Sequence, residues 1–437
     1  MTLSPPKDTY NAVFLIMLLH GIGVLLPWNM LTTIAPSYYV NYKLTNYYEN
    51  GTISYQPSVA TNFLSYLGIA AQVPNLLLSL INLFLRIKGD LTKRVLWSIF
   101  FLGAGVVFTI VFIFIDTSSW IIGFFWMSMV SFVVINGAGG MYQNSVYGIA
   151  AVLPMKFTNA VILGNNICGT FIAIINIITI AGSNNVKIAA TAYFVVSLAV
   201  VIICFLSIAF LKKLNFYKYY DELAKNSTIN KEGEIELAPV QLNMATYIEV
   251  FKKGWQQMIN VFLVFFVTLT IYPTILNDIV PTKYHDNDWN FFISKKYFSP
   301  ITCFLIFNFF ASAGNLIAGY IPIKYKRLIS IPIILRLLFI PFFVFCNFRP
   351  DRRTWSVVFN NEWWYIIGNI IMAFSSGYFS SLSMMYAPQT VENSKSHIAG
   401  MMAAFFLMGG ICAGVGFTFF ITYFTESLGS LSPLKAS

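Results

Sequence analysis

Residues 11–34 read NAVFLIMLLHGIGVLLPWNMLTTI, a run without any Asp, Glu, Lys or Arg. About 20 predominantly apolar residues are enough for a helix to cross the hydrocarbon core of a bilayer. The run is longer than the apolar region of a typical signal peptide, and no clear small-residue cleavage site follows it. It therefore predicts a retained membrane-spanning helix.

Ten further apolar runs follow along the chain of 437 residues. The chain is 57% hydrophobic and 10% charged, whereas a soluble domain carries about a quarter charged residues. This composition argues against a soluble globular protein and against disorder, and it favours a multi-span membrane protein. The eleven expected spans are approximately residues 11–34, 59–85, 95–115, 119–153, 158–181, 188–211, 255–276, 297–323, 328–348, 363–388 and 397–424.

Lys and Arg residues concentrate in alternate loops, and this bias predicts the orientation. With the N-terminus in the cytoplasm, 17 of the 27 Lys and Arg fall in inner segments and nine in outer ones. The positive-inside rule favours this arrangement, which places the C-terminus outside. It also puts the glycosylation acceptor Asn50 in the first outer loop. The short N-terminus shows no retention signal, so the plasma membrane is the default location.

A long hydrophilic insertion at residues 212–254 divides the chain. We expect an N-terminal lobe of six spans at 1–211, a flexible cytoplasmic loop at 212–254 and a C-terminal lobe of five spans at 255–437. This all-α, two-lobed 6+5 division is typical of the major-facilitator-like transporter fold, in which the substrate binds near the midplane between the lobes.

The expected spans contain few ionisable groups. All 17 acidic residues lie outside them, and His20 and Arg336 are the ionisable residues inside. Binding of a proton or Na⁺ in the membrane usually requires a carboxylate. The pattern therefore favours passive movement of a neutral, hydrogen-bonding, planar solute. For His20 a place on the path and a bond to neighbouring backbone are equally compatible with the sequence, and for Arg336 a structural role is favoured.

Uncharged polar residues in the spans have two interpretations. Small residues often only allow helices to pack closely, and this is favoured for Gly410 and Gly414. Amide side chains carry more polar atoms, so a cavity-lining role is favoured for Gln143, Asn308 and Asn315.

Other functional classes lack a signal. The five cysteines are far apart in apolar stretches, so neither a metal site nor a disulfide framework is indicated. The spans hold no set of nucleophile and base that would indicate an enzyme. The net charge of +10 is explained by cytoplasmic loops, and no nucleic-acid partner or cofactor is expected.

Several motifs, taken in order, resemble the equilibrative nucleoside transporter family. The sequence LLPWN at 25–29 resembles the signature of its first span, and NGAGGMYQNSVYG at 136–148 resembles its fourth-span motif. Further matches are LNFYKYY at 214–220, RLLFIP at 336–341 and GYFSSL at 377–382. The resemblance covers about residues 11–424 and implies movement of nucleosides, or of related nucleobases, down their gradient by alternating access.

The resemblance also implies roles for individual residues. Trp28 is expected to stack near the base and Gln143 to hydrogen-bond its edge, with Tyr272 as a pore aromatic. Gly139 and Gly164 match glycines at close helix contacts. The expected substrate-binding set is Trp28, Asn29, Thr32, Gln72, Asn75, Gln143, Tyr272, Asn308, Ala311 and Asn315.

One departure from the family pattern lies in span 8, where the family carries an Asp followed by a Gly-Arg pair. This chain reads ASAGN at 311–315, so both charges are missing together. Removing both partners of a buried ion pair can be nearly neutral for folding. The resemblance assigns that pair to the ribose hydroxyls, so weaker ribose binding is expected. A second hypothesis is a non-transporting relative that acts as a membrane sensor or interaction partner.

Overall fold

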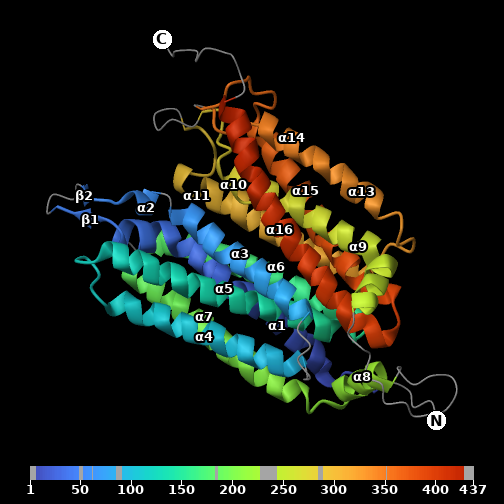
Figure 1. The fold of residues 1–437 in the computed structure, drawn as a ribbon. Helices are drawn as coiled ribbons and strands as arrows, with labels where there is room; N and C mark the ends of the chain where they lie inside the picture. Colours follow the sequence, from blue (N-terminus) through green and yellow to red (C-terminus); the bar gives the residue numbers. More distant parts are fainter. Residues whose placement is uncertain are drawn as a thin grey trace. The chain divides into compact units, whose positions relative to one another are not determined.

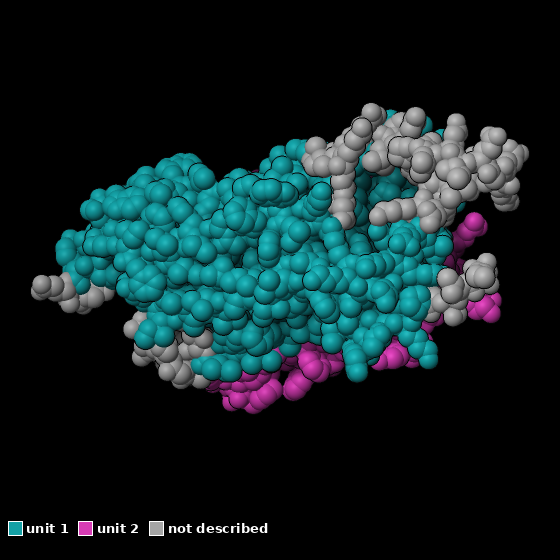
Figure 2. All heavy atoms as spheres, turned by 90° about the horizontal axis from the view of Figure 1, so that it is seen from below, with its two compact units in different colours: residues 1–254, 387–405 teal, residues 255–386, 406–437 magenta. Residues whose placement is uncertain are grey.

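The computed structural model describes residues 6–48, 53–61, 63–84, 91–182, 186–226, 244–283, 289–350 and 352–427, and these are almost entirely helical (Figure 1). The chain divides into two compact units (Figure 2). Unit 1 comprises Met1–Gly254 and Ala387–Phe405, and unit 2 comprises Trp255–Tyr386 and Phe406–Ser437.

Unit 1 is a helical bundle with one short hairpin. The strands β1 (Asn46–Tyr47) and β2 (Ile53–Tyr55) pair antiparallel. The helices are η1 (Thr9–Asn11), α1 (Ala12–Ile34), the π-helix η2 (Ala35–Lys43), α2 (Ser58–Thr61), α3 (Phe63–Phe84), α4 (Leu91–Phe114), α5 (Ile121–Ala151), α6 (Met155–Gly182), α7 (Val186–Leu211), α8 (Asn215–Asn226), η5 (Pro388–Thr390) and η6 (Asn393–Lys395).

Glycines permit a close helix contact in unit 1, between α1 and α6. A Cβ on Gly21 would lie 2.1 Å from the carbonyl oxygen of Val161, and one on Gly164 would lie 2.1 Å from that of Leu18. No side chain fits at either distance, so the two backbones approach directly, as small residues allow in membrane bundles.

Unit 2 contains shorter and more broken helices. They are α10 (Thr274–Asn277), α11 (Lys295–Ser299), the π-helix η3 (Pro300–Leu305), α12 (Ile306–Tyr320), α13 (Ser330–Leu335), the 3₁₀ helix η4 (Arg336–Leu338), α14 (Phe339–Phe345) and α15 (Glu362–Tyr386). Two long helices run from unit 1 into unit 2, namely α9 (Met244–Ile271) and α16 (Ser396–Ser427).

Nine helices among the described residues are long and apolar enough to cross a membrane, and each coincides with a predicted span. The predicted span 328–348 is instead divided among α13, η4 and α14. Pro341 lies within it and has no N–H to donate back along the helix, which favours such a break. The predicted span 363–388 is α15, whose length suffices but whose serines lower its apolar character.

The segment 212–254, expected to be a flexible loop, contains helix at both ends. Helix α8 covers Asn215–Asn226, and α9 already begins at Met244, while residues 227–243 lie outside the described part of the chain. Helix α8 is amphipathic and buries Phe216 and Tyr217. The centroid of the Phe216 ring lies 5.1 Å from that of Phe157 on α6. Packing of the apolar face of α8 therefore explains why this segment is helical, although its polar composition favoured a loop.

Residues 387–405 group with unit 1 although the expected C-terminal lobe included them. The amide nitrogen of Asn144 on α5 donates to the carbonyl of Met401 at 2.8 Å. Lys395 and Glu249 form an ion pair at 2.7 Å. These contacts attach the start of α16 to α5 and α9 of unit 1.

Candidate functional site

Gln143 lies on a face of α5 that has free space beside it. Gly139 precedes Gln143 by four residues, so both lie on the same face of the helix. Both residues are buried. A Cβ on Gly139 would nevertheless meet no atom within 4 Å outside the adjoining backbone. A buried position with open space beside an amide side chain is a suitable wall for a small polar ligand.

Asn75 of α3 packs against the same helix. A Cβ on Gly140 would lie 2.5 Å from Asn75 Oδ1 and 2.4 Å from its carbonyl oxygen, so Gly140 admits α3 to close contact with α5. Asn75 Oδ1 is buried and has no hydrogen-bond partner within the described residues. Gln72, one turn earlier on α3, is partly buried. The structure therefore brings Asn75 to within one helical turn of Gln143.

The three expected site residues of α1 are similarly exposed but differ in their hydrogen bonds. Trp28, Asn29 and Thr32 are all partly exposed. Asn29 Nδ2 donates to Cys168 Sγ on α6 at 3.7 Å. Thr32 Oγ1 donates back to the carbonyls of Trp28 and Asn29, at 3.0 and 3.1 Å. Its hydroxyl hydrogen is therefore used within its own helix. The Trp28 ring is the large planar surface of this group.

Tyr272 and Asn308 meet in unit 2, where α9 ends and α10 begins after Pro273. Asn308 Nδ2 donates to Tyr272 Oη at 3.1 Å and to the carbonyl of Phe304 at 2.9 Å. The Tyr272 ring stacks on Phe307, with centroids 3.9 Å apart and planes inclined by 13°. The tyrosine is therefore held both by its hydroxyl and by its ring face.

Ala311 and Asn315 lie in the contact between α12 and α15. A Cβ on Gly377 would meet the Ala311 carbonyl oxygen at 1.9 Å and Asn315 Oδ1 at 2.9 Å. Ser381 Oγ donates to Asn315 Oδ1 at 2.9 Å. Both residues are buried, and the Asn315 oxygen is already used within unit 2. Ser312, which lies between Asn308 and Asn315 on α12, donates to the Asn308 carbonyl at 2.8 Å and is partly exposed.

The two ionisable residues of the predicted spans both hydrogen-bond to side chains of other helices. His20 Nδ1 lies 2.5 Å from Tyr142 Oη, and its Nε2 lies 3.1 Å from Ser207 Oγ. Arg336 Nη1 donates to Ser375 Oγ at 3.0 Å, and Nη2 donates to Thr268 Oγ1 at 2.7 Å. His20 thus bonds side chains of α5 and α7, where the sequence suggested a backbone bond or a place on the path.

The expected packing glycines require one correction. A Cβ on Gly164, Gly410 or Gly414 would lie 2.1 to 2.6 Å from a backbone oxygen of a neighbouring helix. Gly139 has open space instead, and the close contact expected there falls at Gly140. Successive residues on a helix point about 100° apart, so Gly140 lies on the face packed against α3 while Gly139 lies on an open face. Asn50 lies outside the described residues.

Three features of the candidate site could not be predicted from the sequence. Phe307 stacks on Tyr272, Thr268 holds Arg336, and Gly139 leaves space beside Gln143. No local sequence signal could have revealed them, because the first two pairs join different elements and the space beside Gln143 depends on which face of α5 meets α3.

Acidic residues lie closer to the spans than expected. Helices α9 and α16 extend beyond the predicted runs and include Glu249 and Glu426 near their ends. No group of three or more His, Cys, Asp or Glu in the described part of the chain could hold a metal ion.

The fold resembles that of major facilitator transporters. A proton:xylose symporter of that superfamily aligns with a TM-score of 0.61 at 11% identity, over 95% of this chain and 87% of the other. The human organic anion transporter MFSD10 aligns with a TM-score of 0.56 at 11% identity, over 96% of this chain and 95% of that one. At such low identity the similarity defines the fold class alone.

Sequence comparison gives the family. Residues 129–423 match the nucleoside transporter family, and the chain belongs to it. Human equilibrative nucleoside transporter 1 is 28% identical, over 96% of this chain and 98% of its own length. Human equilibrative nucleoside transporter 2 is 28% identical over 95% and 97%, and rat equilibrative nucleoside transporter 3 is 28% identical over 94% and 89%.

Proposed function

We propose that this integral membrane protein moves nucleosides or related nucleobases down their concentration gradient by alternating access. The observation that carries the proposal is the match of residues 129–423 to the nucleoside transporter family. Similarity to equilibrative nucleoside transporters over nearly the whole chain supports it further.

The proposed substrate contacts are chiefly aromatic rings and amide groups, within each unit by itself. Trp28 stacks on the base, and Gln143 hydrogen-bonds its edge in the space beside Gly139. Tyr272 and Asn308 form the polar wall of unit 2. The other proposed site residues are Asn29, Thr32, Gln72, Asn75, Ala311 and Asn315.

The proposed mechanism is equilibrative, without ion coupling. Proton- or Na⁺-coupled transporters commonly use a carboxylate within the membrane. In this chain Glu249 and Glu426 lie near helix ends, and the proposed site residues are uncharged. A neutral substrate matches this set, and no cofactor or metal is proposed.

The proposed topology has eleven spans in a 6+5 arrangement, with lobes at 1–211 and 255–437. Helices α13, η4 and α14 together form the ninth span, and α15 forms the tenth. The N-terminus is cytoplasmic and the C-terminus extracellular, by the distribution of Lys and Arg. Asn50 is then available for glycosylation, and the plasma membrane is the proposed location.

Selectivity is expected to differ from that of relatives with a charged span 8. Ala311 and Asn315 stand where the family carries Asp and Arg. Each charge-assisted hydrogen bond contributes about 1.5–3 kcal/mol. Their absence corresponds to a loss of ribose affinity of about ten- to a hundredfold or more, which favours the base as the recognised group.

Uptake by proteoliposomes containing the purified protein tests the proposal. Labelled uridine, adenosine and adenine are supplied with no ion gradient, and a Trp28→Ala, Gln143→Ala double variant serves as the matched control. We expect saturable uptake that stops at equal concentrations and is lost in the variant. Absence of uptake of all three by folded protein would favour the sensor or partner role instead.

A further inference from the structure

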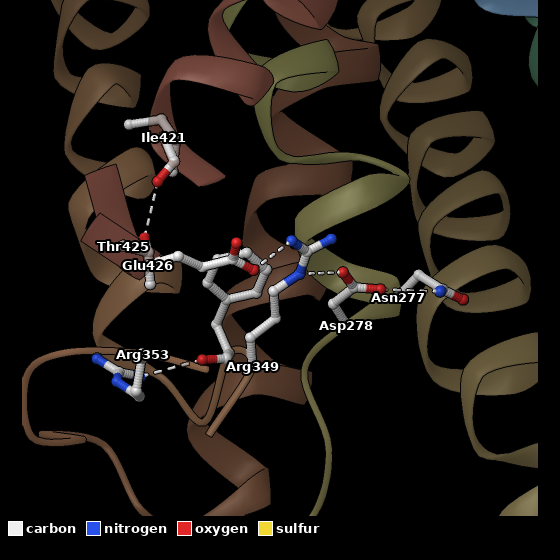
Figure 3. A network of polar contacts seen from close by, with 8 residues as sticks. Asn277, Asp278, Arg349, Arg353, Ile421, Thr425 and Glu426 are labelled. Atoms are coloured by element: carbon white, nitrogen blue, oxygen red, sulfur yellow. Dashed lines mark hydrogen bonds and ion pairs between the residues drawn. The ribbon is translucent and has the colours of Figure 1, made fainter. Parts of the chain in front are cut away.

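Arg349 joins two acidic residues that are distant from each other in sequence (Figure 3). Its Nε donates to Asp278 Oδ2 at 2.6 Å, and its Nη1 donates to Glu426 Oε1 at 2.9 Å. The three side chains are 23–32% exposed, so these bonds are only partly screened by solvent. Asp278 directly follows α10, Arg349 follows α14, and Glu426 belongs to the last turn of α16.

The electrostatics of the cluster depend on the arginine. Burial alone would lower the pKa of Arg349, but hydrogen bonds and attraction to Asp278 and Glu426 outweigh burial and raise it. Without the guanidinium, two carboxylates would face the same small space. Like charges repel, so loss of Arg349 would separate α10 from α16 rather than merely remove a bond.

The backbone at Arg349 is also specialised. Its φ of 44° lies in the left-handed region, which residues with a long side chain rarely adopt. The Arg349 N–H donates to the Asp278 carbonyl at 3.2 Å, and its own carbonyl accepts from the N–H groups of Arg352 and Arg353 at 3.0 and 3.1 Å. A strained backbone conformation of this kind persists only where contacts with the surrounding structure hold it in place.

Helix α10 depends on such anchors because it is only four residues long. It follows Tyr272 and Pro273, where the hydrogen-bond ladder of α9 is interrupted. Tyr365 Oη donates to the Leu276 carbonyl at 3.2 Å, and Cys303 Sγ donates to the Pro273 carbonyl at 3.7 Å. These contacts hold one part of α10, and Arg349 holds its end.

We propose that Arg349 is a positioning residue for substrate binding at Tyr272. By clamping Asp278 to Glu426 it fixes α10, and α10 in turn sets the backbone from which Tyr272 reaches Asn308. The inference rests on the proposed function, because it assigns Tyr272 to the substrate site.

Uptake kinetics test the clamp. We expect Arg349→Gln to raise the KM of the best substrate about three- to tenfold, with Vmax per folded copy unchanged within a factor of two. Arg349→Lys should restore most of the affinity. Arg349→Gly should behave as Arg349→Gln although it relieves the left-handed backbone. The matched control is Arg352→Gln, because Arg352 is an exposed arginine on the same loop.

A charge-neutral variant separates repulsion from simple loss of contact. Arg349→Gln combined with Asp278→Asn and Glu426→Gln removes all three charges, and we expect a KM closer to the wild-type value than that of Arg349→Gln alone. An unchanged KM in Arg349→Gln, with only a lower melting temperature or Vmax, would show a purely structural role and overturn the inference.

Hydrogen exchange gives a readout that does not depend on transport. In the purified protein, Arg349→Gln should accelerate amide exchange at residues 274–280 and leave α12 unchanged. If the wild-type protein shows no uptake, the proposed function fails, while exchange at 274–280 still decides whether the clamp exists. Equal exchange in the variant and the wild type would refute the clamp.

Discussion

The side-chain amide of Asn308 donates to the hydroxyl of Tyr272 at 3.1 Å, and this bond links α12 to the point where α9 gives way to α10. The Tyr272 ring also stacks on Phe307, whose neighbour Asn308 makes the bond. Phe307 therefore contacts the ring face of Tyr272, and Asn308 bonds its hydroxyl. These two contacts make Tyr272 and Asn308 the best-defined part of the proposed site in unit 2.

Removing the Tyr272 hydroxyl should weaken substrate binding. A typical buried hydrogen bond contributes about 1 kcal/mol, so Tyr272→Phe should raise KM about fivefold. Asn308→Ala should have a similar effect, and the double variant should be no worse than either single one, because both remove the same bond. Initial rates of uptake measure this, with Tyr320→Phe, an exposed tyrosine of α12, as the control. Fully additive effects would contradict the pairing.

The two adjacent glycines of α5 should respond in opposite ways. Gly140→Ala places a Cβ 2.4 Å from the Asn75 carbonyl oxygen, so it should destabilise the protein by about 1–3 kcal/mol. Gly139→Ala has room and should fold normally, whereas Gly139→Leu should fold but block uptake by filling the space beside Gln143. Thermal unfolding and uptake distinguish these outcomes. Normal uptake by Gly139→Leu would contradict a substrate in that space.

Restoring the missing charges of span 8 should change selectivity. Ala311→Asp alone places an unpaired carboxylate in the buried contact between α12 and α15, and should lower expression. Adding Asn315→Arg supplies a partner, so the double variant should recover expression and increase nucleoside uptake relative to nucleobase uptake about tenfold. The ratio of adenosine to adenine uptake measures the effect. A ratio equal to that of the wild type would refute the ribose argument.

Arg336 should be replaceable without loss of stability. Its hydrogen-bond partners have acceptors of their own, because Thr268 Oγ1 donates to the Val264 carbonyl and Ser375 Oγ donates to that of Met372. Arg336→Met therefore leaves no hydroxyl proton unpaired and removes a buried charge, so the melting temperature should stay the same or rise. Arg336→Glu should abolish folding. Strong destabilisation by Arg336→Met would indicate that the guanidinium has a partner of opposite charge.

Uptake should not depend on a proton gradient. The proposed site residues are uncharged, so no group in the site is expected to exchange a proton between pH 5.5 and 8. Initial rates in proteoliposomes with equal or unequal pH on the two sides should agree within a factor of two. Several-fold stimulation by external acid would contradict an equilibrative mechanism.

The membrane character, the positions of nine spans and the family motifs could be predicted from the sequence. Runs such as 11–34 are read directly, because length and apolar composition are local properties. The motif at 136–148 likewise placed Gln143 among the candidate residues. The helix at Asn215–Asn226 was missed because polar composition outweighed its amphipathic pattern.

Contacts between distant residues depended on the tertiary structure. No local pattern pairs Tyr272 with Phe307, Thr268 with Arg336, or Arg349 with Asp278 and Glu426, since each pair joins elements separated along the chain. The exchange of roles between Gly139 and Gly140 likewise depended on which face of α5 meets α3. The sequence by itself determined that the chain enters a membrane with few charges, because apolar length is a local property. The tertiary structure decided which polar groups are held together, because helix rotation and packing set the direction of every side chain.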